Sequence, residues 1–388
     1  MNRRSFLANS AKAGLLAATA PLINLGRYRL FGQTSRNYSA RAIDLVKRST
    51  VIDMLNPLSL QMVLGDMAGE KKGDWLSSPE TFTEADLARF QGSGWTVLHI
   101  AVGTGSYDDT LRFLSLWNGF LAHHGHHFLR IDSPARLAEV KASGSLGIIL
   151  GIQNSEHFRS VDDVDFFYNI GQRVSQLTYN TRNMIGNGST ERVDGGISDF
   201  GVAVIGRMNK LGMAVDVSHC GDKTTLDAFD VSKRPVLITH SNCRALNPHV
   251  RCKSDEAIRK MAASGGVMGI TGVRMFVSAK EPTTIENVLD HYDHVAKLVG
   301  VEHLGTGSDI GIDGYDALSP AVHDKLRKSY KSSYGFREHD DVEGLNDSKR
   351  TFDLAEGLIR RGYSDANIEL ILGGNFKRVL TEIWSTKA

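Results

Sequence analysis

The segment FGVAVIGRMNKLGMAVDVSH (residues 200–219) predicts a helix that leads directly into a buried strand. Its first part, up to Gly212, has the apolar periodicity of a helix, and a glycine is a common residue just past a helix end. Its second part is a nearly continuous apolar run, which is typical of a parallel strand that is buried on both faces. A further apolar run, PVLITHS (235–241), follows.

The same alternation of strand and helix patterns covers most of the chain. Further apolar runs are TVLHIAV (96–102), LGIILGI (146–152), GGVMGIT (265–271) and HLGTGSDI (303–310), and further helical patterns cover 83–94, 254–266 and 284–300. Such alternation without a compositional break predicts an α/β fold, a (β/α)8 TIM-type barrel formed by one domain over residues 36–388. A doubly wound sheet is the competing fold. It would need a glycine-rich phosphate turn to bind a nucleotide, and no such motif follows these strands.

Composition narrows the classes of function. The 388 residues carry a formal net charge of +1, which argues against nucleic acid as a partner. No segment reaches the roughly 20 uninterrupted apolar residues of a transmembrane span. Three cysteines do not make a disulfide framework. One disulfide with one free thiol is the alternative.

The N-terminus has the pattern of an export signal. NRRSFLANSAKAGLLAATAPLINLG (residues 2–26) contains paired arginines, Ser-Phe-Leu and a mildly apolar stretch. This indicates a twin-arginine signal with its linker over residues 1–35 and a periplasmic location. The alternative is a basic start followed by an ordinary apolar helix. An uncleaved signal would leave the protein anchored to the membrane.

Three predicted strands end in residues that can carry chemistry. In a parallel barrel the catalytic groups come from the C-terminal strand ends. His219 and His240 end successive strands and are therefore expected to share a metal ion. Asp309 ends the last strand and can serve as a general base. Arg251 lies in the loop after His240 and is expected to bind a substrate carboxylate, whose shape its planar guanidinium group matches. The alternative is that Arg251 is a solvated charge on the surface.

Longer segments resemble one enzyme family. They are VIDMLNPL, GIILGIQNSEHF, GQRVSQLTYNTRN, GISDFGVAVIGRMNKLGMAVDVSH, PVLITHSNCRALNPHVRCKSDE, GGVMGIT, GTGSDIGIDG and LGGNFKRVL. In this order they resemble the renal (membrane) dipeptidase family, the M19 metallopeptidases. The resemblance implies an amidohydrolase-type barrel that hydrolyses dipeptides with two zinc ions, bridged by a glutamate and a water.

Four residues match the family's functional positions. The resemblance makes His219 and His240 the ligands of the second metal. It makes Arg251 the group that receives the substrate carboxylate. It makes Asp309 the acid that handles the proton at the scissile bond.

Four other family positions are altered. The two ligands of the first metal are replaced by Leu55 and Pro57. The bridging glutamate is replaced by Gln153, a neutral amide that bridges metals poorly. The substrate-contacting histidine is replaced by Tyr179. We therefore expect at most one zinc ion, because two imidazoles fall short of the usual three protein ligands of catalytic zinc. The candidate third ligands are Asp309, Gln153, Asp53, Cys220, Cys243 and Cys252.

The leading expectation is an exported hydrolase with a reduced single-metal site, acting on a small dipeptide-like or carboxylate-bearing molecule. One alternative is a metal-free enzyme with tailoring or lyase-type chemistry in the same pocket. The other is an inactive pseudo-dipeptidase that binds a small molecule. The resemblance also suggests a homodimer, because the family has a dimer surface. The polar segment 327–347 is expected to be a plain surface loop, with a flap or an oligomer contact as the alternatives.

Overall fold

The computed structural model describes residues 27–29, 37–59, 75–103, 106–345 and 348–385. The expected export segment, residues 1–35, lies outside these residues except for Arg27–Arg29, so it stays a prediction. Within the described part of the chain, no helix combines the length and the apolar character that crossing a membrane requires.

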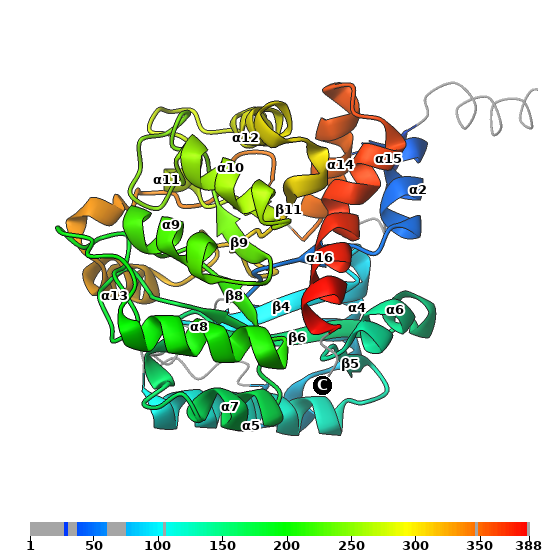
Figure 1. Cartoon of the computed structure of the whole chain (residues 1–388). Helices are drawn as coiled ribbons and strands as arrows, with labels where there is room; N and C mark the ends of the chain where they lie inside the picture. Colours follow the sequence, from blue (N-terminus) through cyan, green and yellow to red (C-terminus); the bar gives the residue numbers. More distant parts are fainter. Residues whose placement is uncertain (1–26, 30–36, 60–74, 104–105, 346–347, 386–388) are drawn as a thin grey trace, which may run out of the picture.

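A closed parallel barrel forms the centre of the molecule (Figure 1). Eight strands follow one another around it, and the circle closes because the first pairs with both the second and the last. They are β3 (Ile52–Asp53), β4 (Val97–Val102), β6 (Leu146–Ile152), β7 (Val174–Gln176), β8 (Ala214–Asp216), β9 (Val236–Ser241), β10 (Met268–Ile270) and β11 (Leu304–Thr306). A ninth strand, β5 (Phe128–Arg130), pairs with the start of β6, and β1 (Arg27–Arg29) pairs antiparallel with β2 (Asn37–Ser39).

Helices surround the barrel (Figure 1). They are α2 (Ala40–Arg48), α4 (Glu84–Gly92), α5 (Tyr107–His123), α6 (Pro134–Ser143), α7 (Asp163–Asn169), α8 (Asp199–Leu211), α9 (Asp222–Val231), α10 (Asp255–Ala263), α11 (Arg274–Val277), α12 (Ile285–Val299), α13 (Pro320–Ser329), α14 (Arg350–Arg360), α15 (Asp365–Glu369) and α16 (Asn375–Trp384). The predicted fold class is therefore confirmed.

Local signals in the sequence set the helix boundaries. At the start of α4, Thr83 and Asp86 form the reciprocal pair of a capping box, which satisfies backbone N–H groups that would otherwise lack partners. α8 begins after Ser198, whose hydroxyl accepts from the Gly201 N–H. It ends at Gly212, where φ is 81° and the missing Cβ makes the left-handed conformation favourable.

The apolar strands are buried on both faces, as their sequences predict. All seven residues of β6 are buried. One face of β6 packs against the outer helices and the other fills the barrel. Gly151 leaves the space that His99 occupies, because a Cβ there would lie 2.0 Å from the His99 Nε2 atom. The barrel interior is therefore a filled core rather than a pore.

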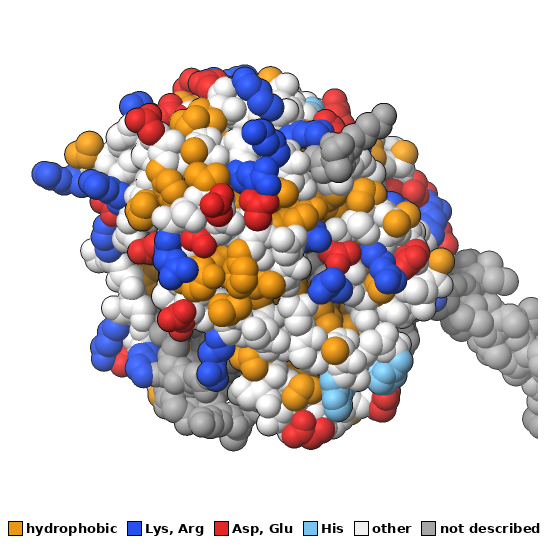
Figure 2. Space-filling view, turned by 60° about the horizontal axis from the view of Figure 1, so that its bottom comes forward, with side chains coloured by type: hydrophobic (Ala, Val, Ile, Leu, Met, Phe, Trp, Pro, Cys, Tyr) orange, Lys and Arg blue, Asp and Glu red, His pale blue; other side chains and the backbone are white. Residues whose placement is uncertain are grey.

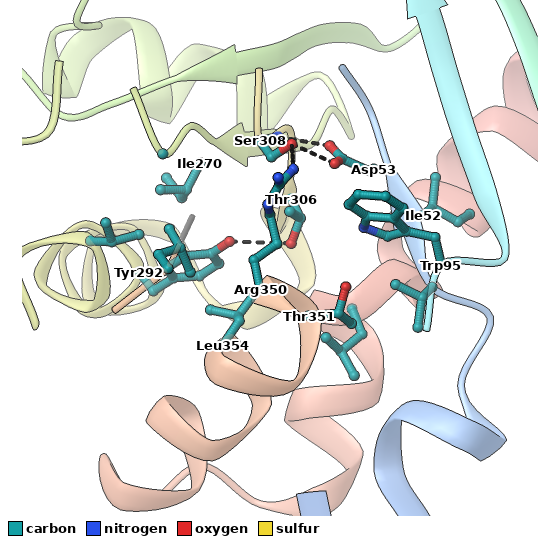
Figure 3. A pocket seen from close by; sticks show the side chains of 15 residues that line it. Ile52, Asp53, Trp95, Ile270, Tyr292, Thr306, Ser308, Arg350, Thr351 and Leu354 are labelled. Carbon is teal, nitrogen blue, oxygen red and sulfur yellow. Dashed lines mark hydrogen bonds between the residues drawn. The ribbon is translucent and has the colours of Figure 1, made fainter. Parts of the chain in front are cut away.

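A buried carboxylate closes the barrel between its first and last strands. Asp53 on β3 accepts hydrogen bonds from the Ser308 N–H (2.7 Å), the Ser308 hydroxyl (2.5 Å) and the Asn56 amide (3.1 Å). Arg350 donates to the Ile310 carbonyl (2.7 Å) and lies beside the same serine (Figure 3). Burial raises the pKa of Asp53, and the bonds from Ser308 and Asn56 and the charge of Arg350 oppose that shift.

The Asp53 cluster borders a cavity between the barrel wall and helices α12 and α14 (Figure 3). Its volume is about 30 Å³, and Trp95, Tyr292 and Leu354 are among its lining residues. This volume has room for water but not for a substrate, since ligand pockets hold at least about 300 Å³.

The surface carries mixed charge. Figure 2 shows lysine and arginine side chains interspersed with aspartate and glutamate over the face in view, without a continuous basic stripe. This distribution agrees with the formal net charge of +1.

We predict that Asp53→Ala lowers the free energy of unfolding by about 2–4 kcal/mol, because it leaves buried donors of Ser308 and Asn56 without an acceptor. Urea denaturation followed by circular dichroism measures the change. Asp230→Ala is the matched control. It removes an exposed carboxylate that pairs with Lys260 at 2.8 Å, and we expect the free energy of unfolding to stay nearly constant. An equal loss of unfolding free energy in the two variants would contradict the conclusion that Asp53 holds the barrel closed.

Candidate active site

The predicted functional residues meet at one mouth of the barrel, at the C-terminal ends of its strands. His240 lies within β9, and His219 follows the end of β8 by three residues. Asp309 follows β11, and Tyr179 follows β7. Arg251 comes from the loop between β9 and α10. Parallel strands bring these ends to the same side, which is why positions far apart in the sequence become neighbours.

The two histidines face each other through their Nε2 atoms, which lie 2.9 Å apart. Both side chains are buried, and their ring centroids are 5.0 Å apart. Burial lowers the pKa of both, and the positive charge of Arg251 lowers it further. Both rings are therefore neutral at pH 7, the form in which imidazole binds metals.

Neighbouring side chains determine which ring nitrogens carry the protons. The His219 Nδ1 atom lies 2.8 Å from the Asn180 Oδ1 atom, which can only accept, so Nδ1 donates. The His240 Nδ1 atom lies 2.8 Å from the Thr239 hydroxyl. That hydroxyl donates its proton to Asp216 (2.7 Å), so it accepts from His240. With both Nδ1 atoms donating, both Nε2 atoms are left as acceptors only 2.9 Å apart, a contact that is favourable only with a proton or a cation between them.

Arg251 is a buried cation with open donors. One of its terminal nitrogens donates to the Ser218 carbonyl. Its Nε and Nη2 atoms make no hydrogen bond of good geometry within the described residues, although the side chain is only 1% exposed and the Tyr334 hydroxyl is close enough to interact with it. The guanidinium carbon lies 5.2 Å from the centre of the Phe276 ring, which supports it. Two N–H groups held together in this way suit a carboxylate.

Asp309 has the environment of a general acid or base. Its backbone is left-handed, with φ at 59°, and its N–H donates to the Leu55 carbonyl (2.8 Å). Burial raises the pKa of its carboxyl group to about 7, although the charge of Arg251 opposes the shift. A carboxyl group with such a pKa can both take and return a proton near neutral pH.

On the other side of the mouth, the described residues at four positions are uncharged. Leu55 and Pro57 are buried. The Gln153 amide donates to the Ala101 carbonyl (3.2 Å). The Tyr179 ring stacks on His219, with 4.2 Å between the ring centroids. These are the residues at the altered family positions, and none of them offers a carboxylate or an imidazole.

The suggested third metal ligands are mostly committed elsewhere. Asp53 is bound to Ser308 and Asn56, as described above. All three cysteines are free thiols in buried surroundings, so the open disulfide pair is not found. Burial raises the pKa of Cys220 to about 11 and that of Cys252 to about 12, which keeps these thiols protonated. The described residues contain no group of three or more His, Cys, Asp or Glu side chains that could hold a metal ion.

This donor set does not fit two metal ions, and with two imidazoles it also falls short of the three protein ligands that are usual for one catalytic zinc ion. Two neutral imidazoles match the preference of zinc for nitrogen ligands, but a four-coordinate ion held by them would need two further ligands from water or substrate. A second ion would need the carboxylates and the histidine that Leu55, Pro57 and Gln153 replace. Two dications close together without a bridging carboxylate would repel each other strongly.

A lid formed by residues 320–336 covers the mouth. It contains α13, and the Tyr330 hydroxyl lies 2.7 Å from that of Tyr179. Tyr330 stacks on Tyr334 at 4.5 Å, and Lys331 donates to the Thr190 carbonyl (3.0 Å). The expectation of a plain surface loop at 327–347 is therefore wrong, because the tyrosines of this polar segment pack onto the site.

A groove of about 330 Å³ runs between this lid and the loop after β7. Its lining residues are Tyr179, Asn180, Thr181, Thr190, Leu326, Ser329, Tyr330, Lys331 and Tyr334. Because Tyr179 and Asn180 both contact His219, the groove leads toward the histidine pair.

Sequence reasoning missed the supporting residues. Asn180, Thr239 and Asp216 orient the histidines, and Tyr330 closes the mouth. Asp216 had a readable signal, since an acid within an apolar strand needs a buried partner. Asn180 and Tyr330 had none, because only the tertiary structure places their loops over the mouth.

Comparison with known proteins identifies the same family. A family model described as membrane dipeptidase (peptidase family M19) matches residues 39–327. Dipeptidase tcpJ of Claviceps purpurea (strain 20.1) is 28% identical over 288 residues, which cover 73% of this chain and 62% of the relative. Dipeptidase verJ of Clonostachys rogersoniana is 30% identical over 248 residues, which cover 63% of this chain and 57% of the relative. The chain thus spans less than two thirds of the length of these relatives.

The barrel also matches a solved structure closely. An amidohydrolase from Pseudomonas aeruginosa superposes with a TM-score of 0.75 and is 27% identical, covering 88% of this chain and 99% of that one. The region matched by the family model contains the barrel strands β3 to β11 and the residues His219, His240, Arg251 and Asp309. The chain belongs to the membrane dipeptidase family, peptidase family M19, whose members are hydrolytic metallodipeptidases.

Proposed function

We propose that this chain is an exported hydrolase that cleaves an amide bond in a small, carboxylate-bearing, dipeptide-like substrate, with one metal ion at most. The observation that carries the proposal is Arg251, which is buried with two unsatisfied N–H donors beside an acid of raised pKa. Buried donors of this kind are rarely left without a partner in proteins, and a substrate carboxylate satisfies both at once.

The reaction consumes one water molecule. Asp309 removes a proton from the attacking water, and the oxygen forms a bond to the amide carbon. The carbon–nitrogen bond then breaks, and the same carboxyl group returns the proton to the leaving nitrogen. The products are a carboxylic acid and an amine. Arg251 holds the substrate carboxylate during both steps and so positions the amide bond near Asp309.

His219 and His240 would hold the metal ion. When bound there, the ion supplies Lewis-acid polarisation of the substrate carbonyl and lowers the pKa of a water ligand. Asn180, Thr239 and Asp216 keep the two imidazoles in the tautomers that this role requires.

We expect zinc-replete protein to contain up to one zinc ion per chain and the His240→Ala variant to contain none. Elemental analysis after gel filtration measures the content. Tyr179→Phe is the control, since it keeps both imidazoles and should retain the metal. Two zinc ions per chain would contradict the proposal of a single-metal site. A wild-type protein without zinc would contradict the proposal that His219 and His240 hold a metal ion.

We expect kcat/KM to fall below about pH 7, because a general base must be deprotonated and the pKa of Asp309 is about 7. This decrease is the acidic limb of the pH profile. Asp309→Asn should abolish it together with most of the activity. Arg251→Met should move the limb to higher pH, because the arginine's charge lowers the pKa of Asp309.

The same arginine variant should lower kcat/KM by about 100-fold, the loss expected for charge-assisted hydrogen bonds. Arg251→Lys keeps the positive charge but loses the planar guanidinium group. Its activity should therefore drop, while the pH at which kcat/KM falls should stay the same. An acidic limb at the same pH in Arg251→Met would exclude Asp309 as the group that titrates.

Export rests on the paired residues Arg3 and Arg4. The double substitution of both by lysine should keep the protein in the cytoplasm, while the unchanged chain reaches the periplasm. Cell fractionation with an antibody against the barrel compares the two. Equal export of both forms would remove the twin-arginine route.

A further inference from the structure

The mouth contains two buried cations, Arg251 and Lys253. Arg251 donates to a backbone carbonyl, as described above. Lys253 is 2% exposed, and its ammonium group donates to the Cys220 carbonyl (2.9 Å) and the Thr225 hydroxyl (3.0 Å). Within the described residues neither cation forms an ion pair. The region therefore favours an anion and disfavours a further cation.

The carboxylates near the mouth are committed to other donors. Asp53 is saturated by Ser308 and Asn56. Asp216 accepts from the backbone and hydroxyl groups of both Ser218 and Thr239, over 2.6–3.0 Å. Asp309 carries the proton transfer, so a cation bound to it would block the base. Among the described residues, no further acid at the mouth remains for a substrate ammonium group.

On the side of the mouth away from Arg251, the described residues at the altered family positions are uncharged, and one of them is aromatic. Gln153 stands where a glutamate would supply negative charge, and its amide donates to a backbone carbonyl. The groove beside Tyr179 and Tyr330 has no acidic residue among those that line it. Its only charged lining residue is Lys331, whose ammonium group pairs with Glu191 at 3.5 Å, so that acid is already committed to a lysine. An uncharged acyl chain suits this groove, whereas a free α-ammonium group would be desolvated without a partner.

We propose that the substrates are N-acyl amino acids, or peptides with a blocked N-terminus, rather than free dipeptides. The inference rests on the proposed function and narrows its substrate class. Arg251 binds the carboxylate, and the uncharged acyl group lies in the groove between Tyr179 and Tyr330. Hydrolysis adds water across the amide bond and yields a free carboxylic acid and an amino acid.

Propionyl-leucine and alanyl-leucine test this directly, because they differ only by the ammonium group. Both enantiomers of leucine are included. Calorimetric titration into the Asp309→Asn variant measures binding without turnover. We expect propionyl-leucine to bind at least tenfold more tightly. Equal or tighter binding of alanyl-leucine, or binding of neither compound, overturns the inference.

Gln153→Glu tests the assigned side of the mouth, since it adds one negative charge at nearly constant shape. In the Asp309→Asn background it should reduce the preference for propionyl-leucine at least tenfold, while the uncharged control Gln153→Ala keeps the preference. An unchanged preference in Gln153→Glu overturns the assignment of this side of the mouth to the acyl group.

Turnover by the wild type separates the two proposals. Tight binding of propionyl-leucine without hydrolysis would refute the proposed function and leave the ligand class standing. Preferential hydrolysis of alanyl-leucine would refute the ligand class and leave the function standing.

Discussion

The barrel depends on the buried carboxylate of Asp53. β3 is two residues long and pairs with β11 through a single residue pair, and backbone hydrogen bonds such as that from Met54 to the Thr306 carbonyl (2.8 Å) continue the closure beyond it. Asp53 reinforces this closure by binding the N–H and hydroxyl groups of Ser308. The next residue, Asp309, is thereby fixed in a left-handed conformation with its N–H on the Leu55 carbonyl. The same interaction therefore closes the fold and places the proposed acid/base group.

The mouth divides into two halves of different chemistry. One half contains the histidine pair, Arg251 and Asp309, and its charge and tautomers are set by buried neighbours. The other half contains Leu55, Pro57, Gln153 and Tyr179, which supply shape and a stacking surface but no negative charge. Membership in the dipeptidase family explains the barrel. The uneven distribution of charge across the mouth is what motivates a single metal ion and a substrate with one anionic end.

Burial gives the mouth its electrostatic character. The imidazoles stay neutral and the thiols stay protonated because desolvation disfavours their charged forms, while the pKa of Asp309 rises to about 7. The lid contributes to this burial through Tyr330, which lies against Tyr179. A lid that excludes water strengthens every electrostatic interaction beneath it.

The sequence by itself determined the barrel, because apolar runs such as LGIILGI and well-capped helices such as 84–92 are local features with local causes. It also indicated His219, His240, Arg251 and Asp309, since the ends of parallel strands necessarily meet. Only the tertiary structure decided how these groups are supported. Asn180, Thr239 and Tyr330 act across long sequence separations, and Asp53, a candidate metal ligand in the sequence, is bound to Ser308 instead. Such roles depend on which donors and acceptors meet in a buried space, and no local pattern encodes that.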